Sequence, residues 1–168
     1  MVVIADDERI IGLDVIRRPG RAQIDAFACA KLVELMALLR HRTVSLLVLD
    51  VAFFGKVDDS PVDEVSIGLY AASETGTPFG YLTSCSDEKT FELMRESSPE
   101  FILLKPFNEK ELIQQVELAM RFPRSLSSPR PIDPEAKSKL DSLYQRVTEE
   151  DAEVIEDRNR EWKGRLNE

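Results

Sequence analysis

Four sets of polar residues in this sequence directly follow short apolar runs and carry groups able to do chemistry. They are the acidic pair Asp6 and Asp7, the carboxylate of Asp50, the hydroxyl of Thr83 and the ammonium of Lys105. Carboxylates held close together repel one another, so three of them need a cation between them. Oxygen ligands favour a hard ion, and Mg²⁺ suits a few carboxylates together with a phosphate. We therefore expect a magnesium site that includes Asp6, Asp7 and Asp50.

The same groups suit the transfer of a phosphoryl group. A carboxylate such as Asp50 can act as the nucleophile and become an aspartyl phosphate. Mg²⁺ and Lys105 would stabilise the charge on the transferred group, which is most of what phosphoryl transfer requires. The Thr83 hydroxyl can then bind a phosphoryl oxygen that was absent before transfer. Such a bond favours the modified state and so shifts a conformational equilibrium.

These residues meet only if the apolar runs before them are parallel strands. The runs predicted as strands span residues 2–5, 22–28, 44–49, 79–83 and 101–104. Helical patterns follow at residues 8–18, 31–40, 60–74, 87–96 and 108–121. Strict alternation predicts an α/β fold, a doubly wound five-stranded parallel sheet with helices on both faces. The carboxyl ends of such strands lie along one edge, where open sheets bind ligands.

Several helix ends can also be predicted. Ser60 followed by Pro61 has the pattern of an N-cap with proline in the first helical position, and Ser86 is a second candidate cap. Asn108, with Glu111 three residues later, is a variant of the capping box. The helix that Asn108 opens is expected to bury Leu112, Ile113, Val116 and Met120.

The motifs at the strand ends resemble those of the receiver domains of two-component response regulators, the CheY-like family. The matching pieces, in family order, are Asp6-Asp7-Glu8, Leu47-Val48-Leu49-Asp50, Tyr81-Leu82-Thr83-Ser84 and Lys105-Pro106-Phe107. The resemblance covers residues 1–121 and implies a flavodoxin-like receiver fold.

That resemblance also implies a role for each residue of the site. Asp50 would be the phospho-acceptor, and a histidine kinase or a phosphotransfer protein would be its donor. The backbone carbonyl of Ala52 would join Asp6, Asp7 and Asp50 in binding Mg²⁺. Beyond the self-catalysed phosphorylation and dephosphorylation of Asp50, we expect no enzymatic activity. The predicted function is a phosphorelay switch that changes the binding of a downstream protein.

Three departures from the family keep other interpretations open. The family usually has an aromatic residue three positions before the lysine, where this sequence has Ile102. In addition, the segment 52–61 is longer than usual and the first predicted helix is short. One alternative is therefore a receiver-fold interaction module that no longer signals by phosphorylation. Another is a small hydrolase that uses Asp50 as its nucleophile. Such enzymes usually need a second acid–base aspartate close behind, and Ala52 occupies that position.

The composition changes after residue 121. Residues 122–134 are rich in proline and serine and are predicted to be a linker. Residues 135–168 are predicted to be a charged helical tail. The linker is expected to uncouple this tail from the receiver domain at residues 1–121. The tail has a weak apolar seam of Leu140, Tyr144, Val147, Val154 and Trp162. We expect it to dock on its own receiver or on that of a second copy in a homodimer, through the face between the fourth and fifth helices.

Composition indicates which kinds of partner and which cellular compartment to expect. The net charge is −9, and both the first 121 residues and the remainder are acidic, which argues against binding nucleic acid. No apolar run is long enough to span a membrane, and no signal-peptide pattern is present, so we expect a cytoplasmic protein that does not bind membranes. The two cysteines, Cys29 and Cys85, are too few for a disulfide framework and are expected to be reduced.

Overall fold

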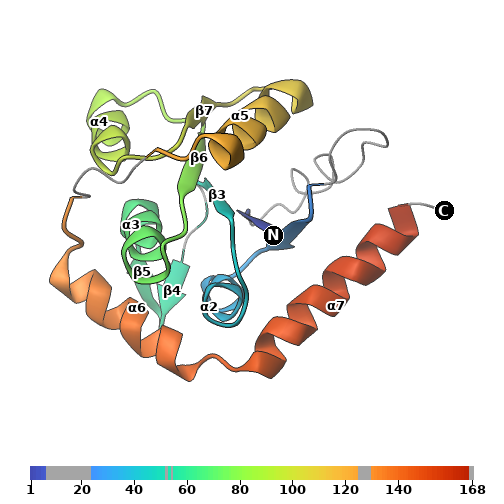
Figure 1. Ribbon diagram of the computed structural model, residues 1–168. Coiled ribbons are helices and arrows are strands. Elements are labelled where there is room, and N and C mark those ends of the chain that lie inside the picture. The colour runs from blue at the N-terminus through green and yellow to red at the C-terminus, as the bar shows by residue number, and fades with distance from the viewer. Residues whose placement is uncertain (7–23, 52, 54, 125–129, 167–168) are drawn as a thin grey trace.

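The central feature of the molecule is an all-parallel sheet of five strands. The computed structural model describes residues 1–6, 24–51, 53, 55–124 and 130–166. The strands are β1 (Val2–Ala5), β2 (Ala26–Cys29), β3 (Leu46–Asp50), β6 (Phe79–Thr83) and β7 (Ile102–Leu104), in the spatial order β2-β1-β3-β6-β7 (Figure 1). The predicted doubly wound sheet is therefore confirmed, with the strand order reversing between β1 and β3.

The two faces of the sheet have separate apolar cores. Because side chains alternate along a strand, Val3 and Leu47 point to one face while Val2 and Leu46 point to the other. Helices α2 (Leu32–His41) and α3 (Glu64–Thr75) bury their apolar residues on the first face, together with Met94 of α4 (Glu88–Glu96). Helix α5 (Glu109–Arg121) covers the second face. The helix predicted at residues 8–18 lies outside the described residues.

A hairpin stands where the start of the third helix was predicted. Residues Gly55–Val57 form β4 and Ser60–Val62 form β5, paired antiparallel, and the helix begins only after its N-cap Asp63. The prediction of a helix start at Ser60 was wrong because Pro61 is equally compatible with an exposed position in a short strand. Asp58 and Asp59 make the turn with positive φ values of 50° and 63°, as a two-residue type I′ turn requires.

The other helix ends follow the sequence more closely. Asn108 and Glu111 form the predicted capping box of α5, whereas Asp87, and not Ser86, caps α4. In α5 the buried residue of the last turns is Ala119, and Met120 is 44% exposed, contrary to the predicted pattern. Gly76 ends α3 with φ of 67°, a conformation that glycine adopts without strain.

The C-terminal residues form two helices that wrap around α2 and α3. Helix α6 (Pro134–Arg146) contacts α3 and α2, and helix α7 (Glu149–Leu166) runs along α2 to the edge strand β2 (Figure 1). The buried apolar residues of the tail that join the core beneath α2 and α3 are Ala136, Leu140, Leu143, Val147, Ala152 and Ile155. Val154, which was predicted to be part of the apolar seam, is 61% exposed.

Polar contacts also join the tail to the sheet and to α2. The side-chain amide of Asn159 accepts a hydrogen bond from the Ala28 N–H at 2.9 Å and donates one to the Ala28 carbonyl at 3.0 Å. Arg158 donates two hydrogen bonds to the carboxylate of Glu34, at 2.6 and 3.0 Å. The expectation that the linker uncouples the tail is therefore wrong. The predicted docking of the tail on its own chain is confirmed, but the face is that of α2 and α3, and not the predicted α4–α5 face.

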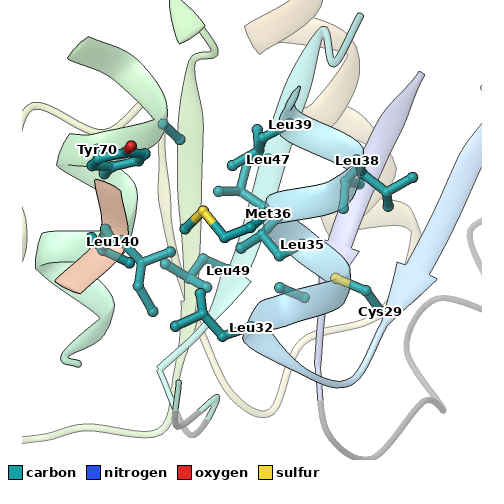
Figure 2. Close-up of a cluster of buried hydrophobic side chains, with 14 of the residues drawn as sticks. Cys29, Leu32, Leu35, Met36, Leu38, Leu39, Leu47, Leu49, Tyr70 and Leu140 are labelled. Atoms are coloured by element: carbon teal, nitrogen blue, oxygen red, sulfur yellow. The ribbon is translucent and has the colours of Figure 1, made fainter. Parts of the chain in front are cut away.

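Figure 2 shows why the tail is needed on that face. Leu140 of α6 lies with Tyr70 of α3 and with Leu32 and Met36 of α2, and all four are almost fully buried. Helix α2 buries six of its ten residues, from Leu32 to Leu39, so it is apolar around most of its circumference. A helix of this kind must be covered on two sides, by the sheet and by a second layer. The positions of the domain boundaries themselves stay a prediction.

Two further findings concern membrane-spanning helices and the cysteines. None of the described helices is long and apolar enough to cross a membrane. Both cysteines are free thiols. Burial raises the pKa of the Cys29 thiol well above its ordinary range, which makes it a poor nucleophile.

Candidate functional site

Asp50 and Lys105 form the centre of the candidate site. Asp50 is the last residue of the central strand β3, and its side chain is only 2% exposed. Lys105 follows the edge strand β7, and its Nζ donates a hydrogen bond of 2.7 Å to Oδ2 of Asp50. The two residues are 55 positions apart in sequence, and the sheet brings them together as predicted. A buried carboxylate is thus held next to a cation that is itself partly open to solvent.

Asp6 lies beside Asp50 on the neighbouring strand. The register pairs Ala5 of β1 with Leu49 of β3, so the next residues along the two strands are Asp6 and Asp50. Adjacent strands are separated by about 4.8 Å, which places both carboxylates at one edge of the sheet. Asp6 is fully buried, and its N–H donates to the Cys29 carbonyl at 3.0 Å.

Thr83 occupies the end of β6, on the other side of β3. Its hydroxyl is buried and accepts a hydrogen bond of 2.9 Å from the N–H of Cys85. Because that bond uses an oxygen lone pair, the hydroxyl hydrogen is still able to donate. The Lys105 N–H donates to the Thr83 carbonyl at 2.7 Å, which joins the ends of β6 and β7, and the following Lys105–Pro106 peptide is cis. Asp50 and Thr83 therefore end β3 and β6, and Lys105 directly follows β7, the next strand of the sheet.

The expected metal ligands are only partly within the described residues. Asp7 and Ala52 lie outside them, so the predicted set is represented there by Asp6 and Asp50, and in those parts of the chain no group of three or more metal-binding side chains occurs. The chemistry of the two carboxylates nevertheless fits the ion. They are adjacent, buried and offer only oxygen, the donor type that Mg²⁺ prefers.

The residues around β7 explain how the aromatic departure is accommodated. Ile102 is half-buried, and Phe101 beside it is buried in the α5 core. A Cβ atom on Gly80 would lie 2.6 Å from the Phe101 ring, so glycine is required there to make room for that ring. Tyr81 points to the opposite core, where its hydroxyl lies 2.9 Å from the Ser97 hydroxyl.

The sequence interpretation missed the part of the site that immediately follows Asp50. The N–H of Phe53 donates to the Asp50 carbonyl at 2.8 Å, and the Phe53 side chain is buried in the α2–α3 core. The β4–β5 hairpin comes next. Two features of the sequence could have predicted this hairpin. Segment 52–61 is unusually long, and the Asp-Asp pair after Val57 suits a hairpin turn.

Comparison with solved structures identifies the fold. The receiver domain of the Francisella response regulator 1452 superposes with a TM-score of 0.60 at 20% identity, covering 73% of this chain and 98% of that chain. This chain has the receiver fold. A response regulator from Thermotoga maritima gives a TM-score of 0.59 at 19% identity, covering 71% and 96% of the two chains. A two-component response regulator from Clostridium difficile gives 0.58 at 16% identity, covering 74% and 97%.

Sequence comparisons add nothing to this identification of the receiver fold. No protein-family model matches the chain, and neither does any curated protein. Identities of 16–20% show a shared fold, while the chemistry has to be argued from the site itself.

Proposed function

We propose that this chain is a phospho-accepting signalling switch in a two-component system, with Asp50 as the residue that is phosphorylated. The observation that carries the proposal is the 2.7 Å contact between Lys105 Nζ and the buried carboxylate of Asp50, beside Asp6 and Thr83. A histidine kinase or a phosphotransfer protein would be the donor. The modified surface would then bind a downstream protein differently.

The transfer uses groups that the fold already holds in place. A carboxylate oxygen of Asp50 attacks the phosphorus, the bond between phosphorus and the donor's imidazole nitrogen breaks, and that nitrogen keeps the electron pair. Lys105 stabilises the negative charge on the phosphoryl oxygens because its ammonium already lies at the carboxylate. Mg²⁺, when bound by Asp6, Asp7, Asp50 and the Ala52 carbonyl, would neutralise further charge on those oxygens.

The switch depends on the contacts that the new group can make. Once Asp50 carries a phosphoryl group, the Thr83 hydroxyl can donate to one of its oxygens, and Lys105 moves from the carboxylate to the phosphate. These contacts exist only in the modified state and so favour the conformation that makes them. We place the protein in the cytoplasm, where its two free thiols stay reduced. Its acidity favours a protein partner over nucleic acid.

Phosphorylation can be tested directly by intact mass. Incubation with acetyl phosphate and Mg²⁺ should add one phosphoryl group to the wild-type chain and none to Asp50→Asn. Asp59→Asn is the matched control, because Asp59 is an exposed aspartate at the tip of the hairpin and should label normally. Unchanged labelling of Asp50→Asn would refute the assignment.

A second candidate function is an interaction module with the receiver fold that does not use phosphorylation. Ile102, in the place of the usual aromatic residue, favours this alternative. Binding of BeF₃⁻ in the presence of Mg²⁺ separates the two functions. A phospho-accepting site should bind this mimic of the phosphoryl group, and a module without phosphorylation should not.

A further inference from the structure

Helix α6 of the tail packs on the segment of chain that directly follows Asp50. In that segment the N–H of Phe53, three residues after Asp50, donates to the Asp50 carbonyl at 2.8 Å. The Phe53 side chain is 1% exposed and belongs to the same apolar core as Leu140 and Leu143 of α6. The tail and the backbone next to Asp50 therefore share one close-packed core.

The β4–β5 hairpin is the second link between Asp50 and the tail. Val57 and Val62 are each 4% exposed and lie in the same core, and α6 contacts β4. At the hairpin turn, the Asp58 carboxylate accepts hydrogen bonds from both terminal nitrogens of Arg146, at 3.1 and 3.4 Å. The last turn of α6 thus holds the tip of the hairpin.

The third link joins α6 to α3, the helix that follows the β4–β5 hairpin. The Tyr70 hydroxyl donates to Asp141 of α6 at 2.8 Å. The rings of Tyr70 and Tyr144 meet edge to face, with centroids 5.9 Å apart. Helix α6 is therefore fixed both to the hairpin and to the helix that comes after it in the chain.

We propose that the α6–α7 tail restrains the segment that follows Asp50, so that the docked tail favours the unmodified protein and modification of Asp50 loosens the tail. This proposal rests on the proposed function of Asp50. Lys105 binds the carboxylate of Asp50 in the same conformation in which Arg146 binds Asp58 and Asp141 binds Tyr70. A close-packed core does not deform continuously, so moving the hairpin to suit a phosphoryl group costs contacts with α6.

Coupling of this kind must act in both directions. If modification of Asp50 weakens tail docking by some factor, then release of the tail must favour the modified state by the same factor, and that factor is the upper limit for a variant whose tail is partly released. Arg146→Ala removes the contact with Asp58, and Tyr70→Phe removes the contact with Asp141. Loss of an exposed ion pair such as Arg146–Asp58 should change the affinity for a phosphoryl mimic by up to about fivefold.

The test uses the full-length chain and two separate measurements. The first is binding of BeF₃⁻ with Mg²⁺, followed by the fluorescence of Trp162, the only tryptophan, which lies in α7. The second is hydrogen exchange of the α6 amides with and without BeF₃⁻.

We expect BeF₃⁻ to speed hydrogen exchange in α6. We also expect Arg146→Ala and Tyr70→Phe to bind BeF₃⁻ about two- to fivefold more tightly than wild type does. Arg160→Ala is the control, because Arg160 pairs within α7, with Asp157 and Glu156, and should bind as wild type does.

The outcomes distinguish this inference from the proposed function. If intact mass shows that Asp50 takes up a phosphoryl group, but exchange in α6 is unchanged and both variants bind BeF₃⁻ as wild type does, the coupling is refuted and the phosphorylation stands. Weaker binding of BeF₃⁻ by the variants also refutes the coupling in the stated direction. If Asp50 takes up neither a phosphoryl group nor BeF₃⁻, the proposed function fails and the coupling fails with it.

Discussion

At the scale of single residues, the site depends on one contact between opposite charges. Asp50 is almost fully buried, and a buried carboxylate is costly unless a cation or hydrogen bonds compensate it. Lys105 provides that compensation through its ion pair with the carboxylate. In the proposed transfer the same ammonium would stabilise the phosphoryl oxygens.

Lys105→Ala should slow phosphorylation by acetyl phosphate about 100-fold, because the variant loses a preorganised charge at the phosphoryl oxygens. The measurement is the initial rate of labelling, by intact mass at timed intervals with Mg²⁺ present. Lys110→Ala is the control, since Lys110 is exposed in the first turn of α5 and has no role in the proposed transfer. A Lys105→Ala variant that labels at the rate of Lys110→Ala would show that Lys105 has no part in the transfer.

At the scale of the elements, α7 completes the edge of the sheet. Strand β2 is an edge strand, and its Ala28 would otherwise present an unpaired N–H and carbonyl. Asn159 binds both groups, and Arg158 next to it binds Glu34 of α2. Exposed edges invite pairing with other chains, so α7 protects the sheet from such pairing while it fixes the tail.

The pairing of α7 with α2 predicts how stability depends on pH. Burial raises the pKa of the Glu34 carboxyl, but its hydrogen bonds from Arg158 and from the Ala30 N–H lower it more, so the pKa is below its ordinary value in the folded state. The stabilisation is therefore present above the unfolded pKa of about 4.3 and is lost as the pH falls through the lower folded pKa. The free energy of unfolding should decrease on acidification below about pH 4.3.

Urea unfolding at several pH values measures this dependence. Glu34→Gln should be less stable than wild type at neutral pH, and its stability should fall less steeply on acidification. Glu153→Gln, at an exposed position of α7, is the matched control and should follow the wild-type curve. The same slope in Glu34→Gln and wild type would mean that the Glu34–Arg158 pair does not contribute.

At the scale of the whole molecule, the tail is a second layer on one face of the receiver fold. Helices α6 and α7 cover α2 and α3 from outside, so this face has a sheet, a helix layer and a further helix layer (Figure 1). Leu140 of α6 is completely buried in that outer contact and lies near Tyr70 of α3 (Figure 2). The tail should therefore unfold together with the rest of the chain.

Leu140→Ala should lower the free energy of unfolding by about 2–5 kcal/mol, the usual cost of a large-to-small change in a packed core. Val154→Ala, on the exposed side of α7, should change it by no more than about 0.5 kcal/mol. Thermal unfolding followed by circular dichroism measures both variants. A small effect of Leu140→Ala, similar to that of Val154→Ala, would show that the tail is only loosely attached.

The sequence by itself determined the sheet and which side chains meet at the carboxyl ends of its strands. Buried parallel strands are continuous apolar runs, and Asp50, Thr83 and Lys105 stand at the ends of such runs, so their convergence follows from local pattern and from the geometry of parallel strands. The capping box at Asn108 and the helix end at Gly76 were also predictable, because caps depend on a few neighbouring residues.

Only the tertiary structure decided where the tail lies and which structure the residues after Asp50 adopt. Ser60-Pro61 suits a helix start and a short strand equally, and burial of Val57 and Val62 in the core beneath α2 and α3 selects the strand. The apolar residues of α2 predict that something must cover it, but a periodic pattern does not say which surface does so. That choice depends on contacts between residues more than about 100 positions apart, such as Asn159 with Ala28, which no local pattern encodes.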